Sequence, residues 1–142
     1  MVEILSSCKI GNDVEVVIVA IYVSPNQTIE DITLFIHRSL VEYTEEVSKI
    51  LKQNFHKLPL ILAGDFNVNF NNKEKFEQLT SFLSDTFDLS INNNPAQFTT
   101  KYCTTVDAVF SRYLDKIESQ TYVSYYSYHK PIITVITKND KI

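Results

Sequence analysis

The strongest constraint on the fold is a change in the spacing of apolar residues between Val14 and Gly64. Val14–Val23 is apolar on both faces, which is typical of a buried central strand. From Thr28, apolar residues recur at every third or fourth position, as in a long amphipathic helix. Leu60–Ala63 is a second short apolar run, and it ends at Gly64. This order predicts a βαβ unit with a right-handed crossover.

The rest of the chain supplies further strands and a second helix. Glu3–Ile10 precedes the first apolar run across Gly11-Asn12-Asp13, which indicates a hairpin. Thr28 stands three residues before Asp31, in a pattern typical of a helix N-cap. Apolar spacing predicts a second helix over about Lys73–Leu83, behind asparagines suited to capping. Runs rich in β-branched and aromatic residues predict strands over Thr105–Arg112, Lys116–Tyr126 and Pro131–Thr137. The fold class is therefore α/β or α+β with a mixed sheet.

Composition limits the organisation of the chain and the ways in which it can bind a partner. The 142 residues suit one domain, and two glycines and four prolines leave no linker. A net charge of −4 and a pI near 5.3 argue against binding nucleic acid through bulk positive charge, so phosphate binding must be local or metal-assisted. No apolar run is long enough to span a membrane, and two cysteines are too few for a disulfide framework. We therefore expect an intracellular protein with no membrane partner.

Two polar side chains follow the short strand Leu60–Ala63. Asp65 and Asn67 alternate with Phe66, so both can project from the carboxyl end of the strand while the phenylalanine points into the core. Open α/β sheets bind ligands at that edge. A carboxylate that polarises a water and an amide that holds it suit the hydrolysis of a phosphodiester. Taken alone, these four residues are better explained as a turn built from turn-forming residues.

A second candidate pair is formed by Asp107 and His129. Asp107 is the charged residue of an otherwise apolar strand, so its carboxylate needs a partner. His129, in Ser-Tyr-His-Lys-Pro, is the natural candidate, because an Asp–His pair fixes the orientation of the imidazole. On its own, His129 would be read as a structural histidine.

Tyrosines and one asparagine complete the set of candidates. Tyr22 and Asn26 flank the end of the first apolar strand, where a phenol and an amide could donate to a phosphate oxygen. Tyr128 belongs to a cluster of four tyrosines that could stack on nucleobases, with Arg112, Lys116 and Lys130 nearby. Tyrosines packed across a sheet are an alternative explanation of that cluster.

Taken in order, four blocks resemble the carboxyl-terminal half of the endonuclease/exonuclease/phosphatase superfamily. The blocks are Tyr-Val-Ser-Pro-Asn, Gly-Asp-Phe-Asn, Thr-Thr-Val-Asp-Ala-Val-Phe and Ser-Tyr-His-Lys-Pro. The match runs from Val14 to Thr137, and the sequence of its blocks looks most like endonuclease-like domains of insect mobile elements. The resemblance implies a partial α/β sandwich of this family, with a mixed sheet and flanking helices.

The resemblance also implies a role for each candidate residue. Asp65 would position or deprotonate the attacking water and Asn67 would orient it. Asp107 would hold His129, which would contact the scissile phosphate. A Mg²⁺ or Mn²⁺ ion, with Asp65 among its ligands, would supply further positive charge. Tyr22 and Asn26 would steady the same phosphate. Tyr128 is a substrate-binding candidate because of its place in the tyrosine cluster and not because of the resemblance.

Two departures from the family pattern leave alternatives open. Tyr128 occupies the position of an aspartate in the family's Ser-Asp-His motif, and no residue before Val14 matches the metal-binding glutamate of the family's amino-terminal half. We therefore expect residues 1–142 to form a single truncated domain that self-associates or pairs with a second chain. Nucleic acid, DNA rather than RNA, is the expected substrate, and the nucleus the expected compartment. An inactive mobile-element remnant that keeps phosphate or nucleic-acid binding and a phosphatase for a small or lipid phosphoester are the alternatives.

Overall fold

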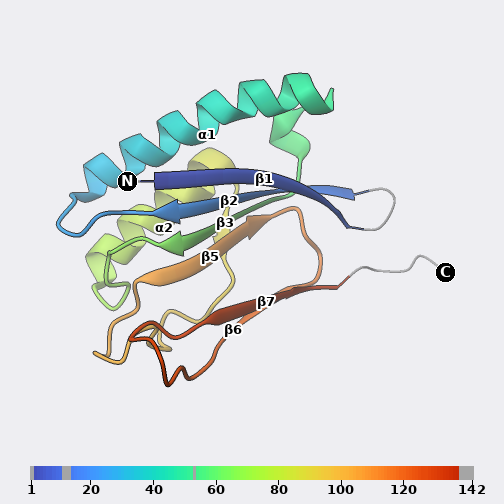
Figure 1. Ribbon diagram of the computed structural model, residues 1–142. Coiled ribbons are helices and arrows are strands. Elements are labelled where there is room, and N and C mark those ends of the chain that lie inside the picture. The colour runs from blue at the N-terminus through green and yellow to red at the C-terminus, as the bar shows by residue number, and fades with distance from the viewer. Residues whose placement is uncertain (1, 11–13, 53, 138–142) are drawn as a thin grey trace.

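The computed structural model describes residues 2–10, 14–52 and 54–137, which form a mixed five-stranded sheet, a two-stranded sheet and two long helices (Figure 1). The large sheet has the order β1-β2-β3-β5-β4, and β6 pairs with β7. In chain order the elements are β1 (Val2–Ile10), β2 (Val14–Tyr22), α1 (Ile29–Leu51), the 3-10 helix η1 (Phe55–Lys57), β3 (Leu60–Asp65), α2 (Lys73–Phe87), β4 (Ser90–Ile91), β5 (Asp107–Arg112), β6 (Ile117–Thr121) and β7 (Ile132–Ile136).

The predicted βαβ unit is present as β2, α1 and β3, with β2 and β3 parallel. β1 pairs antiparallel with β2 along its whole length, as the predicted hairpin requires, although residues 11–13 lie outside the described residues. β5 then pairs antiparallel with β3, so the sheet is mixed, as predicted. The fold class expected from the sequence is confirmed.

Both helices begin at the side chains that the sequence offers as caps. The Thr28 hydroxyl accepts a hydrogen bond from the Asp31 N–H at 3.1 Å. Asn72 caps α2 in the same way. α2 ends at Phe87 rather than at the predicted Leu83, because Phe87 continues the buried face of the helix and Asp88 then turns into the left-handed region.

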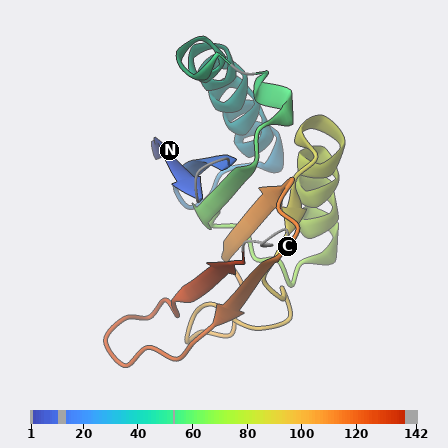
Figure 2. The same cartoon turned by 90° about the vertical axis from the view of Figure 1, so that its right-hand side faces the viewer.

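The large sheet separates two apolar layers. One face packs under α1 and α2 around a core that includes Leu62, Phe66 and Phe110. The opposite face, around Val16, Ile61 and Val109, packs against side chains of β6 and β7. Figure 2 shows the helices on one side of the sheet and the β6–β7 pair on the other. No helix within the described ranges is long and apolar enough to cross a membrane.

The predicted strand Lys116–Tyr126 is wrong in its second half. β6 ends at Thr121, and the following loop exposes Tyr125 and Tyr126 almost completely. Tyrosine has a high strand propensity because it packs well on a sheet, but these two rings meet no neighbouring strand. The loop instead brings the chain round to His129 before β7 begins.

Gly64 allows β2 and β3 to approach closely just before the candidate site. Its φ is +152°, and a β-carbon at this position would lie 1.8 Å from the carbonyl oxygen of Ile21. A side chain here would force the two strands apart. The glycine is therefore required by the packing that places Asp65 at the end of β3.

Candidate active site

Strand register lines up three of the candidate side chains across the sheet. Tyr22 is the register partner of Asp65 between β2 and β3, and Asp65 is the register partner of Asp107 between β3 and β5. Register partners point to the same face of a sheet. Tyr22, Asp65 and Asp107 thus form one row on the face away from the helices, at the carboxyl ends of β2 and β3.

Asp65 occupies the middle of this row and is largely enclosed. Its side chain is 16% exposed, and its Oδ1 accepts a hydrogen bond from the Asn67 N–H at 2.8 Å. Burial raises the pKa of the Asp65 carboxyl, and the negative charge of Asp107 raises it further. The Asn67 N–H and the charge of His129 lower the pKa, but the net shift is upward.

Asn67 ties the end of β3 to the segment that follows β2. Its backbone is in the left-handed region, with a φ of 47°, which asparagine tolerates better than most residues. Its Nδ2 donates to the carbonyl oxygen of Val23 at 2.6 Å. Within the described part of the chain its Oδ1 has no hydrogen-bond partner, so this oxygen is available to a water or a ligand.

Asp107 reaches the imidazole of His129. Its Oδ2 lies 2.9 Å from Nδ1 of the ring, and this is the contact that the apolar surroundings of Asp107 led us to expect. The backbone of Asp107 is fixed by two polar side chains: the Thr99 hydroxyl accepts from its N–H at 3.2 Å, and Asn93 donates to its carbonyl at 3.3 Å.

Sequence reasoning missed Thr99 and Asn93. Both are almost completely buried, at 0% and 2% exposure. The Thr99 hydroxyl also accepts from the N–H of Val106, and Asn93 Oδ1 accepts from the N–H of Val109. These bonds depend on the path of the loop between α2 and β5, and no spacing in the sequence marks that path.

His129 lies on the connection between β6 and β7 and stands between the two carboxylates. Its Nε2 is 3.6 Å from Asp65 Oδ2, and its side chain is 32% exposed. The residues beside it are anchored to the loop before β5: Lys130 N–H donates to the Thr99 carbonyl at 2.7 Å, and Lys101 N–H donates to the Tyr128 carbonyl at 3.0 Å. The imidazole is therefore held at a fixed place beside the sheet edge.

Asp65, Asp107 and His129 could together hold a metal ion, because one ligand atom from each lies within 4.8 Å of the others. Mg²⁺ prefers oxygen ligands and is usually held by one or two carboxylates, with water and substrate phosphate completing the shell. Asp107 Oδ2 is already engaged by His129, so Asp65 is the carboxylate best placed for this purpose. The donor set fits a divalent ion that is shared with a phosphate.

The other candidate residues differ in exposure and in whether they contact the cluster of Asp65, Asp107 and His129. Tyr22 stands in the same row and is 46% exposed, whereas Asn26 is exposed in the loop after β2, with a φ of 65°. Tyr128 contacts the His129 ring, with 4.3 Å between the ring centroids. Arg112 is buried and donates to the carbonyls of Leu58 and Phe87, so it supports the fold and does not face a ligand.

Comparisons with known proteins identify the fold. No family model matches the chain, and no curated protein matches it in sequence. The endonuclease domain of TRAS1, a telomere-specific non-LTR retrotransposon, superposes with a TM-score of 0.66 and 20% identity over 94% of this chain. CdtB, the biologically active subunit of cytolethal distending toxin, superposes with a TM-score of 0.55 and 16% identity, also over 94%.

This chain spans 61% of the length of the TRAS1 domain structure and 51% of that of CdtB. At these identities the likeness shows the fold alone. The fold is the one that these two structures share, and it agrees with the α/β sandwich with a mixed sheet and flanking helices that the resemblance of the ordered blocks implied.

Proposed function

We propose that this chain is a divalent-metal-dependent phosphodiesterase that acts on nucleic acid. The observation that carries the proposal is the position of His129, whose two ring nitrogens face Asp107 and Asp65 at the sheet edge. Asp107 orients the imidazole, and the imidazole lies 3.6 Å from Asp65. The imidazole can stabilise negative charge on a phosphate, and the Asp65 carboxylate beside it can accept a proton.

Asp65 is the residue proposed to activate the attacking water. Its side chain is 16% exposed and its Oδ2 lies 3.6 Å from His129 Nε2, so the carboxylate stands where a water beside the phosphate could pass it a proton. The free Oδ1 of Asn67 would hold the same water. The water oxygen attacks phosphorus, its proton passes to Asp65, and the bond from phosphorus to the leaving deoxyribose oxygen breaks, with that oxygen taking a proton from solvent.

His129 is proposed to contact the phosphate that is cleaved. With Nδ1–H donated to Asp107, Nε2 faces the space above Asp65 and can donate to a phosphoryl oxygen when protonated. Asp107 therefore acts as a positioning residue for the ring. A Mg²⁺ or Mn²⁺ ion held by Asp65 and the phosphate would stabilise the negative charge that develops on the phosphoryl oxygens. Tyr22 and Asn26 would steady the substrate from the end of β2.

Nucleic acid is the proposed substrate because of the fold and its solved neighbours. The TRAS1 domain is an endonuclease of a retrotransposon, and the likeness in fold to it makes DNA the first substrate to test. Action on chromosomal DNA would place the protein in the nucleus. The net charge of −4 implies weak binding away from the site, so recognition depends on local groups and the ion.

Plasmid nicking with Mg²⁺ or Mn²⁺ tests the proposal. We expect wild-type protein to convert supercoiled plasmid to the nicked form, EDTA to stop the reaction, and Asp65→Ala to abolish it. His129→Ala is expected to slow the reaction by about 10²- to 10⁴-fold. Asp85→Asn, an exposed acidic substitution on α2 outside the site, is the matched control and should nick at the wild-type rate.

Three outcomes would contradict the proposal. Nicking that is unaffected by Asp65→Ala would show that the activity comes from a contaminant. Turnover of a small phosphoester in the absence of plasmid nicking would identify a phosphatase, and binding of nucleic acid without any turnover would identify a binding module.

A further inference from the structure

Two exposed tyrosine rings lie directly beside the candidate active site. Tyr102 is 71% exposed and Tyr128 is 41% exposed, and their ring centroids are 5.5 Å apart with 47° between the ring planes. Neither hydroxyl makes a hydrogen bond to another described residue. We call these two residues the tyrosine pair. Since the Tyr128 ring also contacts the His129 ring, the pair extends from the site to the solvent.

Backbone hydrogen bonds fix the two chain segments that carry the tyrosine pair. Lys101 N–H donates to the Tyr128 carbonyl at 3.0 Å, which joins the two loops next to both rings. Tyr102 N–H donates to the Thr100 hydroxyl at 3.3 Å, inside a tight turn that Thr100 and Thr104 close through their hydroxyls. A fixed backbone leaves only side-chain torsions to be ordered on binding, so less conformational entropy is lost than in a mobile loop.

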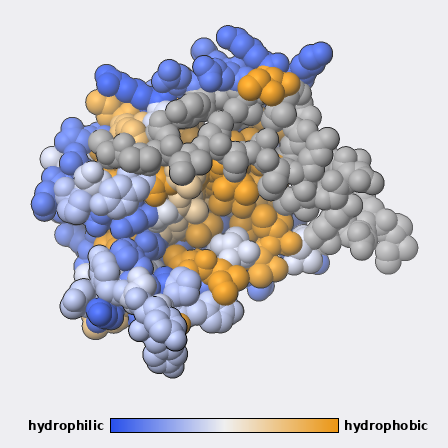
Figure 3. Space-filling model, viewed as in Figure 1, coloured by the Kyte–Doolittle hydropathy of each residue, from blue (hydrophilic) through white to orange (hydrophobic). Residues whose placement is uncertain are grey.

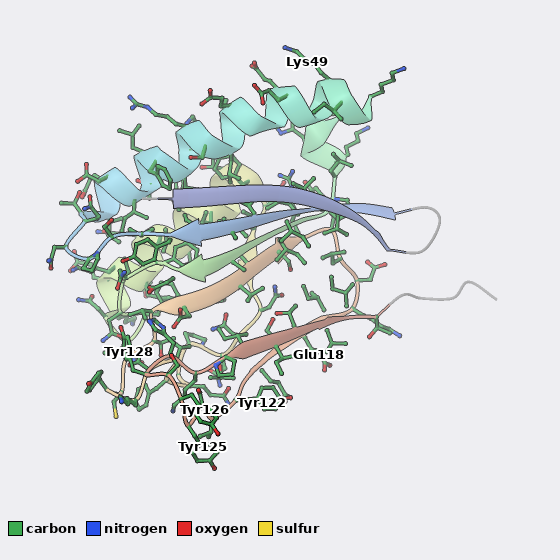
Figure 4. The ribbon with its side chains drawn as sticks, viewed as in Figure 1. Lys49, Glu118, Tyr122, Tyr125, Tyr126 and Tyr128 are labelled. Carbon is green, nitrogen blue, oxygen red and sulfur yellow. The ribbon has the colours of Figure 1, made fainter. Side chains whose placement is uncertain are left out.

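A positive charge accompanies the tyrosine pair. Lys101 Nζ lies 5.9 Å from the centroid of the Tyr102 ring, so an ammonium group is next to an exposed aromatic face. Tyr125 and Tyr126 are more exposed, but they lie away from the site. Figure 4 shows them at the far tip of the loop, with Tyr128 near the end of the sheet.

We propose that the tyrosine pair is a stacking subsite for an unpaired nucleobase adjacent to the phosphate at His129. Exposed aromatic rings stack on the face of any base, while a nearby cation pairs with the backbone phosphate. A base inside a duplex has both faces covered by its neighbours, so only an unpaired or displaced base can stack here. The inference rests on the proposed function and specifies its substrate as single-stranded or locally unpaired nucleic acid.

Binding measured by fluorescence anisotropy tests this subsite. The two probes are a labelled phosphorothioate oligo-dT, which resists cleavage, and a phosphorothioate strand of the same length built from abasic units, both in Mg²⁺. The two strands carry the same charge, so the ratio of their affinities isolates the contribution of the bases. We expect wild-type protein to prefer oligo-dT, and Tyr102→Ala and Tyr128→Ala each to reduce this ratio roughly fivefold or more.

Matched variants separate stacking from a merely structural role. Tyr102→Phe keeps the ring and should keep the wild-type ratio, and so should Tyr125→Ala, which removes an exposed ring outside the pair. Rings that only pack the loops would lower the thermal stability of the alanine variants and leave the ratio unchanged, and that result would overturn the inference. If Tyr128→Ala does not fold, Tyr102→Ala, at the more exposed ring, decides the question.

The subsite and the proposed function fail in distinguishable ways. A ring-dependent preference for bases in a protein that never nicks plasmid would support the subsite and refute the phosphodiesterase. Metal-dependent nicking by a protein that binds both strands equally would support the phosphodiesterase and refute the subsite.

Discussion

At the scale of single residues, the candidate site places two carboxylates where burial disfavours their negative charge. Asp65 and Asp107 are both partly buried on one row of the sheet, and the imidazole of His129 faces both carboxylates. The raised pKa of Asp65 shows that this contact does not fully offset the burial of its carboxylate and the charge of Asp107. A cation or a phosphate-bound ion at Asp65 would relieve the remaining cost.

Asp65→Asn should therefore stabilise the metal-free protein at neutral pH. The pKa of Asp65 is higher in the folded than in the unfolded state, so the ionised carboxylate destabilises the fold above that raised pKa, and the penalty vanishes below the unfolded value. Asparagine keeps an acceptor for the Asn67 N–H and carries no charge. We expect a rise in Tm of roughly a few degrees in EDTA.

The measurement is thermal unfolding of both proteins as a function of pH. The difference in Tm should shrink as the pH falls through the range in which Asp65 becomes protonated. A variant that is less stable at neutral pH, or a difference that grows in acid, would show that the ionised carboxylate is a net stabilising group.

At the scale of elements, the spacing of apolar residues was sufficient to predict α1, β2, β3 and their connection. The loop that leads into β5 was not predictable, because its geometry depends on buried polar side chains that bind particular backbone groups. Thr99 is the clearest case, since one hydroxyl accepts from two consecutive N–H groups. The sequence does indicate that Asp107 needs a partner, but it does not show what fixes the backbone of Asp107.

Thr99→Val should destabilise the protein and lower activity together. Valine has nearly the shape of threonine but leaves one buried and one partly buried N–H group without an acceptor, at a cost of about 1–3 kcal/mol in the free energy of unfolding. Thr99→Ser keeps the hydroxyl and should retain most of this stability. Urea unfolding measures the difference, and a valine variant as stable as the serine variant would show that these hydrogen bonds contribute nothing.

At the scale of the whole molecule, apolar side chains reach the surface on the side of β6 and β7. Ile133 and Val135 on β7 are 51% and 56% exposed. Figure 3 shows further apolar side chains in the middle of the face that it views, between the large sheet and β7. Among the described strands, β6 and β7 pair only with each other, so each also presents an unpaired backbone edge. Both features favour contact with a second chain.

We predict that the protein self-associates through the β6–β7 side. Sedimentation equilibrium should give a mass that rises with protein concentration, and Val135→Lys should lower the association constant. Ile50→Lys, at an apolar residue of α1 that is 76% exposed, is the matched control and should leave the constant unchanged. A monomer at every concentration would contradict the prediction.

The role proposed for Asp107 is to act through His129 on a phosphate bound at Asp65. Its most direct test is the rate of plasmid nicking in Mg²⁺ by Asp107→Asn beside wild type and the Asp85→Asn control. We predict a loss of about 10- to 100-fold or more for Asp107→Asn, because an amide orients the imidazole poorly, with the control unchanged. Wild-type nicking that Asp107→Asn leaves intact would contradict this role.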